Sequence, residues 1–171
     1  MTRTTHIVQS RHTVTFDTNS VDDSSLIAAA IDAGFDVAYT SVTEREFDGT
    51  TFRPAIAASS QIMEAAVIGE SRIGSCVIAS DQEEGRLERL VEIISNGSFQ
   101  LGQAEGRSLG HARQLRDAMI LSAHIREGRS IFVTNDVKGF IAGGRRELIE
   151  KEFGSKIMTG AEFRQFCQFS K

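Results

Sequence analysis

The alternation of strand-like and helix-like segments is the feature that most constrains the fold of this chain. His12–Asp17 (HTVTFD) alternates polar and apolar residues and is rich in β-formers, which predicts a strand. A cluster of capping residues, Asp22-Asp23-Ser24, precedes a helical pattern over Leu26–Ala33, and Asp36–Ser41 again favours a strand. A strand, a helix and a strand in this order imply two parallel strands joined by a right-handed crossover.

The same alternation returns in the last third of the chain. Helices are predicted over Arg113–Glu127 and Glu147–Phe153, and short strands over Ser130–Thr134 and Lys156–Met158. Thr159–Glu162 (TGAE) has the spacing of a capping box, in which two side chains satisfy free amide groups at the start of a helix. Together these elements predict an α/β fold with three α/β/α layers around a central, mostly parallel sheet.

The middle of the chain is less regular. Ala55–Ile68 is rich in alanine, which predicts a helix, and Gln82–Ser95 has apolar residues at helical spacing. Between them, Arg72–Ala79 is compatible with a strand or with a buried piece of helix. Ser98–Gly110 contains three glycines and few apolar residues, which predicts a loop. The chain has no internal repeat and no evident linker, so a single domain is expected.

Composition limits the classes of function only loosely. The formal net charge of −4 gives no support to a protein that grips nucleic acid through many phosphate contacts, although an acidic metal site would itself contribute to it. Cys76 and Cys167 lie far apart, which argues against a disulfide framework or a zinc site. The N-terminal residues lack the apolar core of a signal peptide, and no apolar run approaches the ~18 residues of a membrane span. A cytoplasmic protein without membrane contact is expected.

Several carboxylates fall where the predicted strands end. Asp17 closes the first strand, Glu46 follows the second, and Asp136 follows Ser130–Thr134. Asp117 lies in the first turn of its predicted helix, where the helix dipole favours a negative charge. In open α/β sheets the chemistry lies beyond the carboxyl ends of the strands. Converging carboxylates repel unless a cation neutralises them, and oxygen ligands select hard cations such as Mg²⁺ or Mn²⁺.

Each of these acids also has a structural explanation. Asp17 suits an Asx turn, Asp136 a helix cap, and Asp117 a solvent-facing position on a helix. Two other acids, at positions 44 and 48, could take the place of Glu46. The joint pattern of acids after successive strands is what favours a metal site over four separate structural roles.

Four segments together resemble the PIN-domain family. They are TFDTN (Thr15–Asn19), SVTEREF (Ser41–Phe47), RDAMILSAHIREG (Arg116–Gly128) and IFVTNDVKGF (Ile131–Phe140). They come in the family's order and on the expected elements, so the resemblance covers nearly the full chain and implies a single PIN-like domain over residues 1–171. The segment around 52–110 is longer than in compact members of the family, and no family motif maps onto it.

The resemblance implies roles for individual residues. It assigns catalysis and metal binding to four carboxylates, namely Asp17, Glu46, Asp117 and Asp136. In PIN domains the second acid stands three residues after a threonine, and the distance from Thr43 is what selects Glu46. Asn19 resembles the polar residue that supports the first acid, and Thr134 resembles the hydroxyl beside the fourth.

The implied activity is that of a ribonuclease which uses Mg²⁺ or Mn²⁺ to hydrolyse RNA phosphodiester bonds, leaving a 5′-phosphate and a 3′-hydroxyl. Arg145 and Arg146 are the first choice for gripping phosphate, with a solvated helix start as the alternative. The other cations that flank the motifs are Arg45, Arg53, Arg113, Arg116 and Lys138. Besides RNA, the partners to consider are a second copy of the chain and an antitoxin-like inhibitor protein. A toxin, an RNA-processing enzyme and a defence nuclease all fit the same acids.

Other functions are less favoured by the sequence. The chain has no GxSxG and no GxxxxGK[ST] motif, which disfavours a serine hydrolase and a P-loop protein. An outer role for His124 near Asp117 is less favoured than a packed histidine. A phosphatase or phosphotransferase with Asp17 as nucleophile usually has a second Asp where this chain has Asn19. A catalytically inactive PIN-like module that binds RNA or protein is the rival outside the enzymes.

Overall fold

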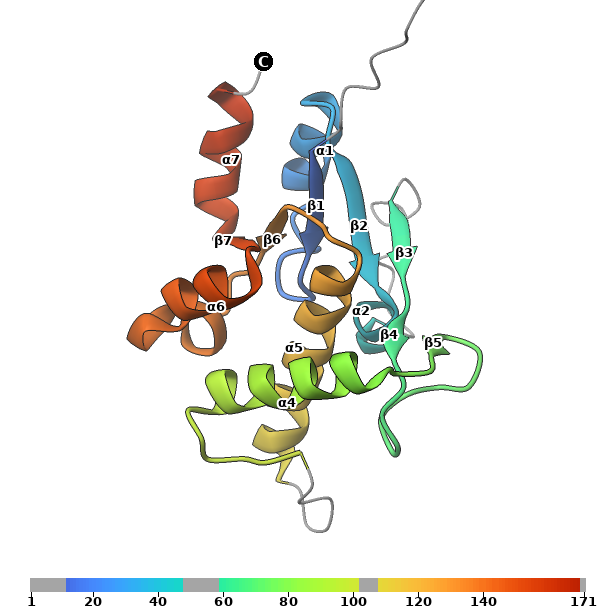
Figure 1. Ribbon diagram of the computed structural model, residues 1–171. Helices are drawn as coiled ribbons and strands as arrows, with labels where there is room; N and C mark the ends of the chain where they lie inside the picture. The colour runs from blue at the N-terminus through green and yellow to red at the C-terminus, as the bar shows by residue number, and fades with distance from the viewer. Residues whose placement is uncertain (1–11, 48–58, 102–107, 170–171) are drawn as a thin grey trace, which may run out of the picture.

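A five-stranded parallel sheet forms the centre of the molecule in the computed structural model, which describes residues 12–47, 59–101 and 108–169 (Figure 1). The strands lie in the order β3-β2-β1-β6-β7, so that the first strand of the chain is the middle strand of the sheet. Their bounds are β1 Thr13–Phe16, β2 Asp36–Thr40, β3 Ser60–Ile62, β6 Ile131–Val133 and β7 Lys156–Met158. Because all neighbours are parallel, their carboxyl ends meet at one edge.

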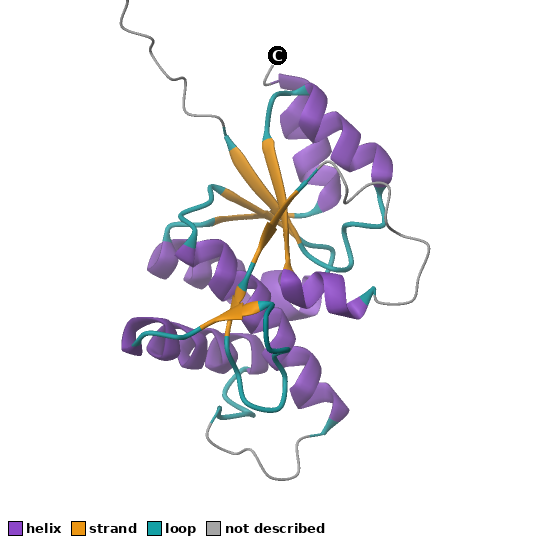
Figure 2. Ribbon diagram, turned by 90° about the vertical axis from the view of Figure 1, so that its right-hand side faces the viewer, coloured by secondary structure: helices purple, strands orange, loops and turns teal. Residues whose placement is uncertain are grey.

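Helices cover both faces of this sheet, which gives three layers (Figure 2). On one face lie α1 and α7, and on the other lie α4, α5 and α6, while the short helix α2 follows β2 directly. The bounds of the helices are α1 Ser24–Asp32, α2 Ser41–Glu46, α4 Asp81–Ser95, α5 Leu109–Arg126, α6 Arg145–Phe153 and α7 Gly160–Phe169. The α/β class and the layered arrangement predicted from the sequence are confirmed.

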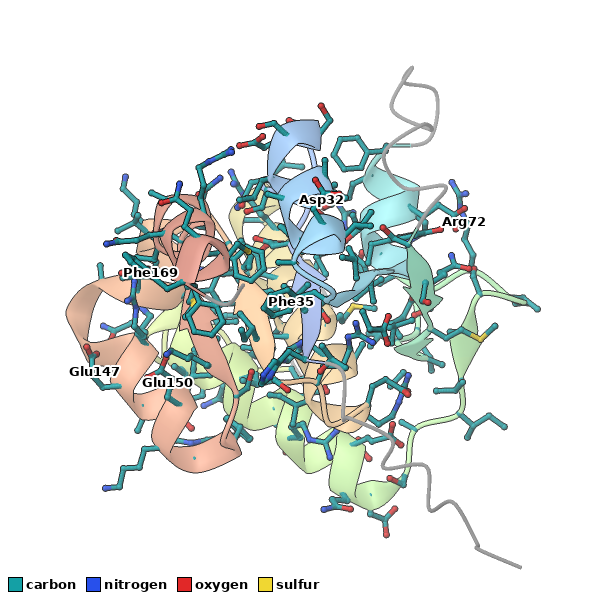
Figure 3. The ribbon with its side chains drawn as sticks, turned by 90° about the horizontal axis from the view of Figure 1, so that it is seen from above. Asp32, Phe35, Arg72, Glu147, Glu150 and Phe169 are labelled. Carbon is teal, nitrogen blue, oxygen red and sulfur yellow. The ribbon has the colours of Figure 1, made fainter. Side chains whose placement is uncertain are left out.

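Side chains of the strands alternate between two hydrophobic cores. Phe16 of β1 packs under α7, where the ring of Phe163 meets it edge-on with the centroids 5.7 Å apart. Phe35, labelled in Figure 3, contacts the same ring from the start of β2, with the centroids 5.3 Å apart. Phe132 of β6 faces the opposite way and is fully buried among residues of α4, α5 and α6. Burial on both faces fixes the register of the strands, because a one-residue slip would exchange the two faces.

The middle of the chain departs from its predicted structure. The helix predicted over Ala55–Ile68 is wrong from residue 59 onward, and its earlier part lies outside the described residues. Ser60–Ile62 instead forms the edge strand β3, in parallel register with β2, and two short strands pair beyond it, β4 (Glu64–Ala65) and β5 (Cys76–Val77). Helix propensity is a weak preference, and here pairing with the free edge of β2 and burial of Ile62 outweigh it. Of Arg72–Ala79, for which a strand and a buried helical piece were both open, only Cys76–Val77 forms a strand, and the other residues are turn or irregular.

Helix α5 begins earlier than predicted. It starts at Leu109 rather than Arg113, because the hydroxyl of Ser108 accepts a hydrogen bond from the His111 amide at 3.2 Å and caps the helix there. Asp117 therefore lies in the third turn, and the expectation that it lies in the first turn is wrong. The dipole at the start of α5 has little effect there, because its influence falls off within the first turn.

The segment after β6 turns sharply before α6. Val137–Ile141 forms a π turn, and Ala142–Gly144 a 3-10 turn in which Gly143 and Gly144 have positive φ angles of 69° and 79°. Such angles favour glycine, so this pair allows the chain to reverse into α6. The capping box predicted at Thr159 is confirmed, since the Thr159 amide donates to Glu162 at 2.7 Å and the Glu162 amide donates back at 3.2 Å. Of the helices in the described residues, none is long and apolar enough to cross a membrane.

Candidate metal centre

Asp17 lies at the carboxyl end of the middle strand and is only 1% exposed. Its Oδ1 accepts the Thr18 amide at 2.8 Å, and its Oδ2 accepts the hydroxyl of Thr134 at 2.7 Å. The parallel register of β1 and β6 brings these two residues side by side, because Phe16 is paired with Val133. Burial raises the pKa of Asp17 to about 6; the two hydrogen bonds oppose the rise, and nearby negative charges add to it.

Asp117 approaches the same edge of the sheet from α5 and is half-buried. Burial is the largest cause that raises its pKa, to about 8, followed by the negative charges of Asp17 and Asp136. The charge of Arg113, one turn earlier on α5, acts in the opposite direction. The charges of Asp17 and Asp136 therefore act on Asp117, although the three acids come from separate elements.

Asp136 stands just past the end of β6 and has two sets of contacts. Its amide donates to Thr134 Oγ1 at 3.0 Å, and its Oδ1 accepts the Gly139 amide at 2.9 Å. The structural explanation of Asp136 as a cap for the following turn is thus also correct. A Cβ atom at Gly139 would lie 2.9 Å from Asp136 Oδ2, so this glycine leaves the room that the carboxylate occupies.

Glu46, at the end of α2, is the most exposed of the four acids. Its Oε2 accepts the hydroxyl of Thr18 at 2.5 Å, and the same hydroxyl oxygen lies 3.4 Å from Thr43 Oγ1. Glu44 points elsewhere, since its Oε2 accepts the side-chain amide of Gln61 at 2.5 Å. The geometry therefore favours Glu46 over Glu44 as the acid next to Asp17, whereas the other alternative, Asp48, lies outside the described residues.

Asn19 connects the segments that follow β1 and β6, next to Asp17. Its Oδ1 accepts the amide of Asn135 at 2.7 Å and lies 3.5 Å from the hydroxyl of Thr134. Asn135 in turn accepts the amide of Gly160, the first residue of α7, at 3.1 Å. Thr134 contacts both Asp17 and Asp136, whereas Asn19 is linked to Asp17 through Thr134. The contacts of Asn135 and Thr18 are not predicted from the sequence. The sequence shows only that each of them is next to one of the four acids.

Most of the cations proposed for phosphate binding have protein partners. Arg145 donates to the carbonyl oxygens of Ile93 and Ala142, and Arg146 forms a two-pronged ion pair with Glu162 at 2.9 and 3.1 Å. Arg116 pairs with Glu70 at 3.0 Å and Arg45 with Glu64, while Arg53 lies outside the described residues. Lys138 is exposed two residues after Asp136, and the charge of Arg113 acts on Asp117.

His124 lies apart from the four acids. It is fully buried between Thr15 Oγ1, at 2.9 Å from its Nδ1, and Ser155 Oγ, at 2.6 Å from its Nε2. Burial lowers its pKa to about 3, so the ring stays neutral. The interpretation as a packed histidine is confirmed.

The chemistry of the donors fits a hard divalent cation. Carboxylate and hydroxyl oxygens surround Asp17, and Mg²⁺ or Mn²⁺ prefers oxygen ligands. Within the described residues, no three His, Cys, Asp or Glu side chains are grouped tightly enough to hold a metal ion by themselves. The charges of Asp136 and Glu46 nonetheless contribute to the raised pKa values of Asp17 and Asp117.

Comparisons with known proteins add nothing to this geometry. No protein-family model, no curated protein and no solved structure matches the chain. The assignment of the site therefore depends on the residues themselves.

Proposed function

We propose that the chain is a divalent-metal-dependent ribonuclease that hydrolyses phosphodiester bonds of RNA. The observation that carries the proposal is the buried carboxylate of Asp17 at the end of the middle strand, electrostatically coupled to Asp117, Asp136 and Glu46. Negative charges converge in a fold only at a considerable cost, which a bound cation removes. The resemblance of the surrounding motifs to PIN domains supports RNA as the substrate.

Asp17, Asp117 and Asp136 would hold Mg²⁺ or Mn²⁺, with Glu46 as a further ligand, directly or through water. Such an ion lowers the pKa of a water and stabilises the charge that develops on the phosphate during in-line attack. Thr134 orients Asp17 by its hydroxyl hydrogen bond, and Thr18 joins Asp17 to Glu46 through its amide and its hydroxyl. Lys138 and Arg113 would offset the charge of the RNA backbone near the scissile bond.

The test is cleavage of a labelled single-stranded RNA with Mg²⁺, with Mn²⁺ and with a chelator. Metal-dependent cleavage that leaves 5′-phosphate ends is expected. The Asp17→Asn variant should lose it by at least a hundredfold, since its carboxylate lies at the centre of the site. Asp32→Asn is the matched control, because Asp32 is exposed at the end of α1 (Figure 3), where the chain returns to the amino end of β2 and not to the carboxyl ends of the strands.

Two other results would point to other functions. RNA that binds but is never cut with either metal would favour a non-catalytic module and contradict the nuclease. A phosphoryl group trapped on Asp17 would favour a phosphotransferase. Burial argues against the latter, because a carboxylate that is 1% exposed and accepts two hydrogen bonds leaves little room for a phosphate ester in line with its oxygen.

A further inference from the structure

A buried ion pair fixes one side of α2 to β4. The guanidinium group of Arg45 donates to Oε1 of Glu64, whose side chain is fully buried, and only 12% of the Arg45 side chain is exposed. The backbone amide of Glu64 also donates to Ser41 Oγ at 2.9 Å. Ser41 and Arg45 are four residues apart in a helix, so both contacts lie on the same side of α2.

The other side of α2 faces the candidate metal centre. Thr43 Oγ1 lies 3.4 Å from Thr18 Oγ1, and Thr18 donates its hydroxyl hydrogen bond to Glu46 at 2.5 Å. Thr43 and Glu46 are three residues apart and therefore share a side of the helix. One short helix is thus held by β4 on one side and presents an acid to Asp17 on the other.

The orientation of α2 has to come from such contacts. The helix has six residues, too few to be stable alone in water. The ion pair that holds it stabilises little by itself, since removing two charges from water offsets most of their attraction. Among the described residues, Arg45 Nη2 and Glu64 Oε2 are buried and have no hydrogen-bond partner. An apolar pair in place of Arg45 and Glu64 could contribute as much stability. The charged pair also fixes the relative orientation of the two side chains, because its hydrogen bond is directional.

We propose that Glu64 is a positioning residue for the metal centre: through Arg45 it fixes α2 so that Glu46 stands beside Thr18 and Asp17. Glu64 is the first residue of β4 and lies two residues beyond the carboxyl end of β3, so the segment that follows the edge strand also contributes an acid to the support of this site. Arg45 is then committed to the protein and does not contact RNA. The inference rests on the proposed function, because it assumes that Glu46 helps to bind the cation.

The test is a double-mutant cycle on the affinity for Mn²⁺, measured by isothermal titration calorimetry on the full chain. Glu64→Gln alone should weaken binding about tenfold or more, the range typical of residues that orient metal ligands. In the Glu46→Gln background the same change should have little further effect, because the ligand that it positions is already lost. An unchanged affinity for Glu64→Gln, or an equal loss in both backgrounds, would overturn the proposal.

Two further variants separate positioning from folding. Arg45→Lys keeps a positive charge opposite Glu64 but loses the planar guanidinium group with its several N–H donors. We expect it to lose less Mn²⁺ affinity than Glu64→Gln, and to lose it only when Glu46 is present. Glu152→Gln breaks the exposed pair with Arg89 between α4 and α6 and should leave the affinity unchanged. If the wild-type chain binds no Mn²⁺, the proposed function fails and the inference with it. If it binds and folded Arg45→Lys and Glu64→Gln bind equally well, the positioning role alone is refuted.

Discussion

Replacing Asp17 by Asn should stabilise the protein at neutral and alkaline pH in the absence of metal. The carboxyl of Asp17 has a pKa of about 6 in the fold against an ordinary value of 3.8. A carboxyl whose pKa is raised by folding destabilises the native state once it is ionised, so stability is highest below the ordinary pKa and falls as the pH rises through 6. The shift of about two pKa units corresponds to about 3 kcal/mol at pH values well above 6.

The asparagine removes this penalty but keeps most of the shape. It can accept only one of the two hydrogen bonds that Thr18 and Thr134 donate, which costs about 1 kcal/mol. The variant should therefore be about 2 kcal/mol more stable than the wild type at about pH 8, and no more stable at about pH 4. Relief of the charge felt by Asp117 would add to the gain.

Urea unfolding with a chelator, followed at several pH values, measures this difference. Asp32→Asn is the control, since Asp32 is exposed and should follow the wild type across the range. A difference between Asp17→Asn and wild type that stays constant from acidic to alkaline pH would refute the reasoning, and so would a less stable variant at alkaline pH. Either result would mean that Asp17 is not desolvated as its burial indicates.

Two further predictions concern the cation. Gly139→Ala would place a Cβ 2.9 Å from Asp136 Oδ2 and displace that carboxylate. The affinity for Mn²⁺ should therefore fall about tenfold, which is typical when a metal ligand or its supporting residue is displaced. Gly85→Ala is the control, because the space around Gly85 on α4 is open, and it should leave the affinity unchanged in the same titration. Binding of Mn²⁺ at neutral pH should release close to one proton, because Asp117, with a pKa of about 8, is mostly protonated there. Calorimetry in buffers of different ionisation enthalpy measures the release, which should fall towards zero well above pH 8; no release at neutral pH would contradict the assignment of Asp117.

Much of this geometry could be predicted from the sequence because it depends on local patterns. The ends of β1 and β6 follow from short apolar runs bounded by polar residues, and a parallel sheet brings such ends together. Asp17 and Asp136 therefore reached one edge as expected. Asp117 also lies at this edge, but not in the first turn of its helix as expected. Ser108 caps α5 earlier, which places Asp117 in the third turn. There burial and neighbouring charges, rather than the helix dipole, govern its ionisation.

What could not be predicted depends on contacts between distant segments. β3 forms because the free edge of β2 accepts it, and nothing local in an alanine-rich segment signals such an edge. The sequence does not indicate the position of Glu64 for the same reason, because the helix predicted through this segment separates it from the strand ends. The sequence likewise does not predict that Arg146 pairs with Glu162 and Arg116 with Glu70, because the partners are far apart along the chain. A cation next to a motif is therefore a weak indication of phosphate binding.

The raised pKa values of Asp17 and Asp117 are the physical basis for the proposed cation. Asp17 is buried because β1 is the middle strand, and the hydrogen bonds from Thr18 and Thr134 do not restore its pKa to the ordinary value. An amide or a hydroxyl at this position could satisfy part of the same bonding without the charge. Asp136 alone suffices to cap the turn at Gly139, and that role does not require Asp117 nearby. Ionised Asp17 and Asp117 thus destabilise the fold, and we expect the proposed divalent ion to offset this cost when it binds beside them.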